Sequence, residues 1–392
     1  MQTDNVKSVV RLTVGILLFG ALVFPAQAVF TSLYIFGDGV CTTTNNTSGG
    51  TNYWGKRFTN GRVWVEVLAQ RQGLTNNSIT NVNWSLSSNN WSYFSINNGT
   101  DYQSSSNLVR NLTSFNKPSD ASNALFVVWV CDADFVDDMN DHNIGDPSNS
   151  SHGTNIVAWT NAINQSITNH WKIVTNLYYA KGARTLVMPN AVDITEIPEY
   201  DLLVSSAQKS FVRQRVIDFN TAFVTTLNQA RTSLPGITIY EPDIFTLLDN
   251  VLTNAAAYGL TNALYLGQSI DALEDPLLTD KSLNGRGTNY IFWDYDDPTA
   301  KFHEVMADVV QQLISPVQIT NLTLLNGSNQ LDMADIPIGL NGFVDGSTNL
   351  VPGGWTSVTN INSTNATQTI FVPASAPLQF YRLRFPFAWS WP

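Results

Sequence analysis

The chain has 392 residues, of which 43% are hydrophobic and 13% are charged. Its formal net charge of −11 argues against polyanionic partners, so we expect no nucleic-acid-binding function. The length allows one large α/β domain and a smaller module, and the apolar content is sufficient for a sizeable core.

Residues 1–28 have the pattern of a secretory signal peptide. Lys7 and Arg11 give a weakly basic start, an apolar stretch covers residues 12–24, and Ala26-Gln27-Ala28 matches a cleavage site. The apolar stretch has only about 13 residues, which is too few to cross a bilayer as a membrane anchor. We therefore expect an exported protein, secreted, periplasmic or on the cell surface, with no membrane span in the mature chain.

Short apolar runs alternate with longer amphipathic segments as far as residue 314. The expected strands are Leu33–Phe36, Ile79–Trp84, Ala124–Val130, Thr185–Met188 and Ile237–Tyr240. The expected helices are Asn60–Leu74, Asn155–Lys181, Phe211–Leu234 and Thr299–Leu313. A loop rich in Asp, Asn, Gly and Ser is expected after Asp134, as far as Ser151. This alternation predicts a parallel five-stranded sheet with helices on both faces.

The pattern changes at Ser315, where short β-prone pieces are separated by turn pairs such as Asn326-Gly327. The segments 347–358 and 379–385 resemble a β-module that is often appended to exported bacterial proteins. We therefore expect a domain from 29 to 314 and a β-sandwich-like module from 315 to 392. The alternative is a linker and tail without a function of their own.

Three stretches of the first domain resemble the GDSL, or SGNH, ester hydrolases. The first strand ends at Gly37-Asp38-Gly39, where that family has Gly-Asp-Ser. Residues 60–74 are similar to the family's "GR-x-W-x-E-x-LA" helix, and residues 294–299 are similar to its Asp-x-x-His-Pro-Thr motif. The resemblance covers residues 32–314. It implies a three-layer α/β/α, flavodoxin-like fold with the site at the carboxyl ends of the strands.

The same resemblance shows which catalytic groups are replaced. Gly39 stands at the position of the nucleophilic serine, Ala133 at that of the oxyanion-binding asparagine and Asp297 at that of the catalytic histidine, so only Asp294 of the triad remains. The glycine block of the family is matched weakly at residues 81–88. The resemblance therefore implies a catalytically degenerate protein that keeps a crevice for a small acyl or sugar ligand.

Two alternatives stay open at this point. One is an active ester hydrolase with rearranged catalytic groups. The other uses the carboxylates expected in the crevice as a Ca²⁺ site or an acid–base pair, unless these residues only cap turns or lie in solvated loops. The carboxylates are Asp38, Asp132, Asp134, Asp294, Asp296 and Asp297. No His or Cys spacing indicates a metal site, and His303 is expected to be structural or on the surface. No cofactor is expected. The oligomeric state is left open.

The resemblance also suggests a disulfide between Cys41 and Cys131, because the residues that follow the first and third strands flank one pocket in this fold. The alternatives are two buried thiols, or Cys41 as a replacement nucleophile. No histidine is placed to activate Cys41.

Overall fold

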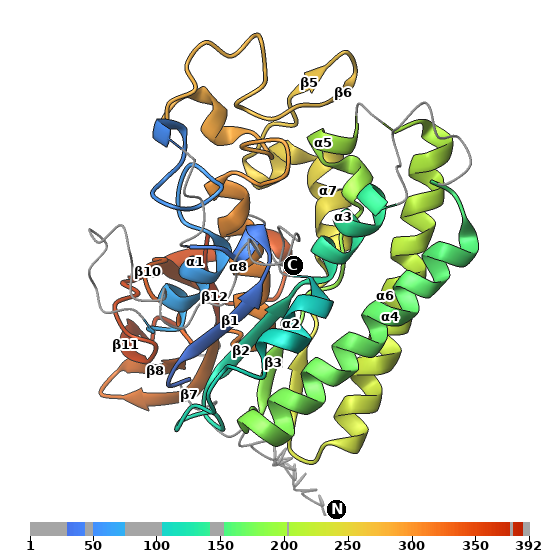
Figure 1. Ribbon diagram of the computed structural model, residues 1–392. Coiled ribbons are helices and arrows are strands. Elements are labelled where there is room, and N and C mark those ends of the chain that lie inside the picture. The colour runs from blue at the N-terminus through green and yellow to red at the C-terminus, as the bar shows by residue number, and fades with distance from the viewer. Residues whose placement is uncertain are drawn as a thin grey trace, which may run out of the picture.

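The computed structural model describes residues 30–43, 50–74, 104–141, 153–201, 204–376 and 379–386. They form an α/β domain followed by an antiparallel β region (Figure 1). No helix in these ranges is both long and apolar enough to cross a membrane. The expected signal peptide, the expected strand Ile79–Trp84 and the weakly matched block at 81–88 lie outside the described residues.

The centre of the domain is a parallel sheet of four strands in the order β1-β2-β3-β4. The strands are β1 (Leu33–Gly37), β2 (Leu125–Trp129), β3 (Thr185–Val187) and β4 (Thr238–Tyr240). Every residue of β2 is buried, as expected for an apolar run covered on both faces. The predicted parallel α/β architecture is confirmed, with four of the five expected strands in the described ranges.

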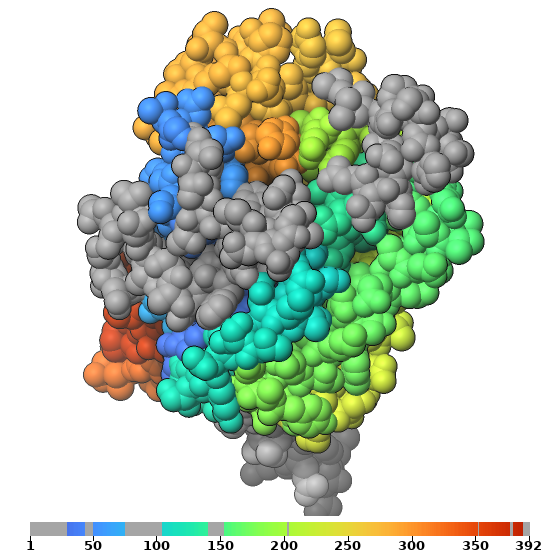
Figure 2. Space-filling model, in the orientation of Figure 1, coloured from blue at the N-terminus to red at the C-terminus, as the bar shows by residue number. Residues whose placement is uncertain are grey.

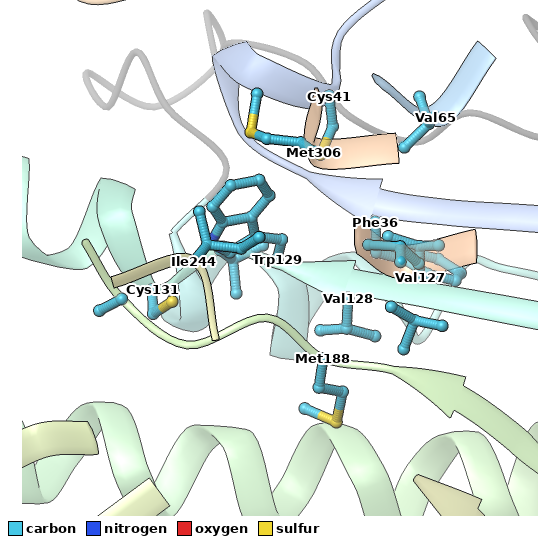
Figure 3. Close-up of a cluster of buried hydrophobic side chains, with 14 of the residues drawn as sticks. Phe36, Cys41, Val65, Val127, Val128, Trp129, Cys131, Met188, Ile244 and Met306 are labelled. Carbon is cyan, nitrogen blue, oxygen red and sulfur yellow. The ribbon is translucent and has the colours of Figure 1, made fainter. Parts of the chain in front are cut away.

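Helices cover both faces of the sheet (Figure 1). On one face α1 (Trp64–Arg71) packs against α8 (Ala300–Ile314); on the other lie α2 (Ser105–Asn111), α4 (Ile156–Asn176) and α6 (Ser206–Ser233). The remaining helices are α3 (Cys131–Asp141), α5 (Pro198–Asp201) and α7 (Ile244–Thr253). Figure 3 shows the core from the side, with Val65 and Met306 on one side of the sheet and Met188 on the other.

Helix caps explain where two of the predicted helices begin. The side chain of Asn155 accepts hydrogen bonds from the N–H groups of Val157 and Ala158 at the start of α4. The hydroxyl of Thr299 accepts one from the N–H of Phe302 at the start of α8. These two helices lie where the sequence predicts them.

The prediction of a loop after Asp134 is wrong over its first half, because α3 continues to residue 141. Asp132 and Asp134 lie in its first turn, where the helix dipole favours negative charge. Phe135 and Met139, four residues apart, are both buried on the same face of the helix. Residues 135–141 therefore continue the helix that begins at Cys131.

A lobe forms at the carboxyl ends of the strands from the chain between α7 and α8 (Figures 1 and 2). It contains the short hairpin of β5 (Leu264–Tyr265) and β6 (Gln268–Ser269). Trp293 is fully buried in a small cluster of the lobe, and its indole N–H donates to the carbonyl of Asn52 at 2.9 Å. This anchor fixes the loop that starts at Asp294.

The C-terminal region contains two three-stranded antiparallel sheets, as its sandwich-like pattern predicts. Their orders are β10-β9-β12 and β11-β8-β7. The strands are β7 (Gln318–Leu325), β8 (Ser328–Ala334), β9 (Gly342–Ser347), β10 (Thr356–Ile361), β11 (Gln368–Pro373) and β12 (Phe380–Arg384). Its hydrophobic core is a separate cluster around Leu331 and Val344. The region contacts the first domain at α1, where the N–H of Ile338 donates to the carbonyl of Arg71 at 3.1 Å.

Candidate functional site

A small pocket of about 80 Å³ lies at the carboxyl ends of β1 and β2. We call it the carboxyl pocket. It is lined by Asp38, Gly39, Val40, Asp132, Ala133, Val136, Val192, Ile194, Ile197, Asp296 and Asp297. The three positions that the sequence assigns to replaced catalytic groups, Gly39, Ala133 and Asp297, therefore all lie at one pocket.

Asp38 follows β1, and its backbone N–H donates to the carbonyl of Trp129 at 3.2 Å. Its side chain is only 5% exposed, and neither carboxylate oxygen has a hydrogen-bond partner among the described residues. Burial raises the pKa of Asp38 to about 7; the nearby amides of Ala133 and Val40 oppose this rise, while the charge of Asp134 adds to it. Asp38 is thus a buried acid that main-chain amides compensate only in part and that has no side-chain partner in the described part of the chain.

The second wall of the pocket is the first turn of α3. Ala133 contributes a methyl group and is 3% exposed, so it supplies no side-chain donor there. The carboxylate of Asp132 accepts a hydrogen bond from the N–H of Val192 at 2.9 Å. Burial raises the pKa of Asp132 well above its ordinary value, and the charge of Asp38 raises it further.

The third wall is the loop before α8. Asp294 accepts hydrogen bonds from the N–H groups of Asp296 and Asp297, at 3.1 and 2.8 Å, and from the hydroxyl of Tyr53, at 2.8 Å. Asp294 thus forms the turn but is not among the residues that line the pocket. Burial raises the pKa of Asp294 to about 7. Asp297 lines the pocket and is 5% exposed; burial raises its pKa well above the ordinary value, and the charges of Asp294 and Asp38 add to this.

Asp296 also lines the pocket and brings in a residue that the sequence did not reveal. Burial raises the pKa of Asp296, and a hydrogen bond with Glu199 of α5 raises it further. One oxygen of each carboxyl group is buried without a partner in the described part of the chain. The contact with Glu199 thus adds to the effect of burial on Asp296.

The comparison with protein-family models agrees with this architecture. A model of the family described as GDSL-like Lipase/Acylhydrolase matches residues 33–310. The chain belongs to this family. A search of curated proteins found no match. Among solved structures, a xyloglucanase of glycoside hydrolase family 44 from Paenibacillus polymyxa is similar at 10% identity and a TM-score of 0.19. That similarity covers 72% of this chain and 61% of the xyloglucanase, and it is too low to carry an argument.

Few of the described residues that line the pocket are of the types that ester hydrolysis requires. Such hydrolysis needs a nucleophile, a base, and donors for the oxyanion. Gly39 has no side chain, Ala133 has no side-chain donor, and Asp297 is an acid whose pKa is raised by burial. Tyr53, which the sequence did not single out, donates its hydrogen bond to Asp294 rather than into the pocket.

The predicted disulfide is not formed, because the structure has both Cys41 and Cys131 as buried thiols. In Figure 3, Cys41 lies beside Met306, above the ring of Trp129, and Cys131 lies below that ring. The sulfur atom of Cys131 is 3.9 Å from the carbonyl oxygen of Pro189. The two side chains thus point into different layers of the core, although their backbones follow neighbouring strands.

Asp134, expected in the same crevice, belongs to a different pocket. That second pocket, of about 230 Å³, lies between α2, α3 and α4. Asp134 accepts hydrogen bonds there from the N–H of Ser105, at 2.8 Å, and from the hydroxyl of Ser166. The ring of His170 packs edge-on against Phe223 close by. Asp134 is thus compensated by its own partners, unlike Asp38.

His303 is buried in α8 rather than on the surface. Neither ring nitrogen has a partner among the described residues, and burial lowers its pKa to about 3. It does not line the carboxyl pocket, so it is not placed to act as a base for that site. Two other histidines, at 142 and 152, lie outside the described residues.

Proposed function

We propose that this GDSL-like protein no longer hydrolyses esters and retains the family's crevice for a small acyl or sugar ligand. The observation that carries the proposal is the convergence of Gly39, Ala133 and Asp297 on one pocket. Removing the catalytic triad of a serine hydrolase costs about 10⁶ in rate, and removing one oxyanion donor costs about 10²–10³. Two of the three triad positions and one donor position are substituted here.

The apolar part of the pocket supports the idea that a ligand still enters. Val40, Val136 and Val192 line the pocket with apolar side chains, together with Ile194 and Ile197. Specific sites commonly combine such an apolar wall with a few polar groups that fix the ligand's orientation. A short acyl group, such as an acetyl, fits a volume of about 80 Å³.

The proposal includes export. Residues 1–28 have the charge, apolar stretch and cleavage pattern of a signal peptide. A ligand outside the cell or in the periplasm is therefore the one we expect the protein to meet. N-terminal sequencing of the mature protein tests this point, and a chain that begins at Met1 after expression in an exporting host contradicts it.

The test of the main proposal is an esterase assay on the purified mature chain. Short p-nitrophenyl esters and acetylated sugars serve as substrates, with the Asp297→Asn variant as a matched control for contaminating activity. We expect turnover far below the ~1 s⁻¹ typical of enzymes, and equal in both proteins. Turnover near 1 s⁻¹ that the Asp297→Asn change abolishes would overturn the proposal.

A further inference from the structure

The carboxyl pocket has an unusual charge composition for its degree of burial. Its lining includes Asp38, Asp132, Asp296 and Asp297, and no Lys, Arg or His is among the residues that line it. None of the ion pairs formed by the described residues includes one of these four acids. Elsewhere in the described chain, the buried Glu66 and Asp345 are paired with arginine. The pocket therefore lacks the cation that its acids would favour.

Asp38 provides a second, independent observation. Asp38 lines the pocket, and only 5% of it is exposed. Neither of its carboxylate oxygens has a hydrogen-bond partner by geometry in the described ranges. A buried carboxylate without a hydrogen bond costs several kcal/mol, so such groups are normally paired or protonated. An entering group that donates hydrogen bonds and carries positive charge would relieve this cost.

The geometry does not favour a metal ion as the entering cation. No group of three or more His, Cys, Asp or Glu side chains in the described part of the chain is arranged to hold a metal. Calcium needs six to eight oxygen ligands and magnesium needs a near-ideal octahedron. Moreover, Val40, Val136 and Val192 form an apolar wall, which would contribute nothing to a bare ion.

The volume limits the size of the group that enters. At about 80 Å³ the pocket has roughly half the 150 Å³ of a cavity known to hold benzene, so it admits about three or four heavy atoms. A primary ammonium on one or two carbon atoms has this size. Its three N–H donors can reach several carboxyl groups at once, while its carbon atoms pack on the apolar wall.

We infer that the carboxyl pocket binds the aminoalkyl end of a ligand, a primary ammonium on a short carbon chain, with Asp38 and Asp297 as its charge partners. This inference rests on the proposed function, in which the pocket retains a ligand without ester chemistry. It adds the chemical class of the group that enters: the acyl or sugar ligand carries an amine.

Binding is coupled to proton release. Before binding, a protonated carboxyl of the pocket holds its proton on oxygen. When R–NH₃⁺ enters, the O–H bond breaks, the proton leaves to solvent and the carboxylate pairs with the ammonium. The negative charges that interact with Asp38 are those of Asp132 and Asp134 from α3 and of Asp297 from the loop before α8. Glu199 of α5 raises the pKa of Asp296. No basic group among the pocket's lining residues opposes them, so affinity should rise as pH rises towards 8.

The test is calorimetric titration of the full mature chain with ethylammonium chloride, which stays protonated below pH 9 as a lysine side chain does. Ethanol is the neutral probe of the same size, and CaCl₂ is the competing cation. We expect saturable binding of ethylammonium only, at least tenfold tighter at pH 8 than at pH 5, with proton release measured in two buffers of different ionisation enthalpy. Equal heats for ethylammonium and ethanol, or binding of Ca²⁺ alone, would overturn the inference.

Two variants sharpen the result. Asp38→Asn keeps the shape of the side chain and should weaken ethylammonium binding at least tenfold, whereas the matched control Asp280→Asn, at an exposed turn, should leave binding unchanged. An equal effect of both variants would overturn the inference. If Asp38→Asn does not fold, carboxyl NMR of the unaltered chain decides, because ethylammonium must lower the pKa of pocket aspartates. Esterase turnover would contradict the proposed function alone, and absent ammonium binding in an inactive chain would contradict this inference alone.

Discussion

The carboxylate of Asp294 accepts a hydrogen bond from the backbone N–H of Asp297 at 2.8 Å. In the family resemblance, Asp294 orients the side chain of a histidine at position 297. In this chain its two oxygens bind main-chain N–H groups and the hydroxyl of Tyr53 instead. The retained member of the triad thus has a structural role, because it shapes the turn that carries the substituted residue.

We predict that Gly39→Ser alone leaves the protein inactive towards esters. The new hydroxyl would face Asp297, and no histidine among the residues lining the pocket could take its proton. The measurement is p-nitrophenyl acetate hydrolysis by the variant and the unaltered chain at equal concentration. Full activity from this single change would show that the assignment of Asp297 to the histidine position is wrong.

Asp38→Asn should make stability less dependent on pH. The pKa of Asp38 is raised from 3.8 to about 7, so the folded state keeps a proton that the unfolded chain has released between these values. The stability that Asp38 contributes is therefore present below pH 4 and lost as pH rises to 7, by up to about 4 kcal/mol. Urea unfolding at pH 4.5 to 7.5 measures this loss.

The loss should be smaller in Asp38→Asn than in the unaltered chain, because the amide does not ionise. Other pocket acids with raised pKa values, such as Asp297, preserve part of the dependence of the unfolding free energy on pH in the variant. The exposed Asp280→Asn control should follow the unaltered chain. Parallel curves for all three proteins would contradict the burial of an unpaired Asp38.

Breaking the buried ion pair between Arg57 and Glu66 should be strongly destabilising. Both side chains are fully buried, and Glu66 also accepts a hydrogen bond from the N–H of Val63 at 3.1 Å. Arg57→Leu leaves the carboxylate without its charge partner, which we expect to cost about 3–5 kcal/mol in urea unfolding. The double variant Arg57→Leu/Glu66→Gln should recover a large part of the lost free energy of unfolding. A double variant as unstable as Arg57→Leu alone would contradict the charge argument.

Residues 29–314 should fold without the C-terminal module. The core cluster of the module shares no residue with that of the first domain. The truncated chain should melt cooperatively, at a lower temperature, because it loses contacts such as the one between Ile338 and Arg71. Calorimetry measures the transition; aggregation or a non-cooperative melt would show that the two regions share one folding unit.

Thiol titration should find two thiols per chain in denatured, unreduced protein. Cys41 and Cys131 are both buried thiols in the structure, and burial raises the pKa of each well above its ordinary value. The folded chain should therefore react slowly with a thiol reagent and the denatured chain quickly. A denatured chain with no titratable thiol would restore the disulfide hypothesis.

The sequence predicts those features that depend on local patterns. Apolar runs predict the four described strands, and amphipathic segments predict α4 and α8 with starts at Asn155 and Thr299, where the structure has their caps. Motif positions brought Gly39, Ala133 and Asp297 to one pocket. These signals are visible because strand burial and helix capping each use residues close together in the chain.

The sequence fails where the outcome depends on side-chain direction or distant partners. The Asp- and Asn-rich composition after Asp134 predicts a loop, but residues 135–141 continue α3. The sequence suggests a disulfide from strand neighbours, but Cys41 ends the short helical turn after β1 and Cys131 begins α3, and their side chains lie on opposite sides of the ring of Trp129 (Figure 3). Glu199 and Tyr53 meet the site only through tertiary contacts, and no local spacing marks them.

Asp38 is fixed by its main chain rather than by its side chain, since its N–H extends the ladder between β1 and β2 to Trp129. Its carboxyl group, by contrast, has no side-chain partner among the described residues and only main-chain amides beside it. Gain or loss of the proton therefore changes the electrostatic potential of the cavity while its walls stay in place. The acidity of the surroundings can thus set which charge the protein accepts, at constant shape and without any moving part.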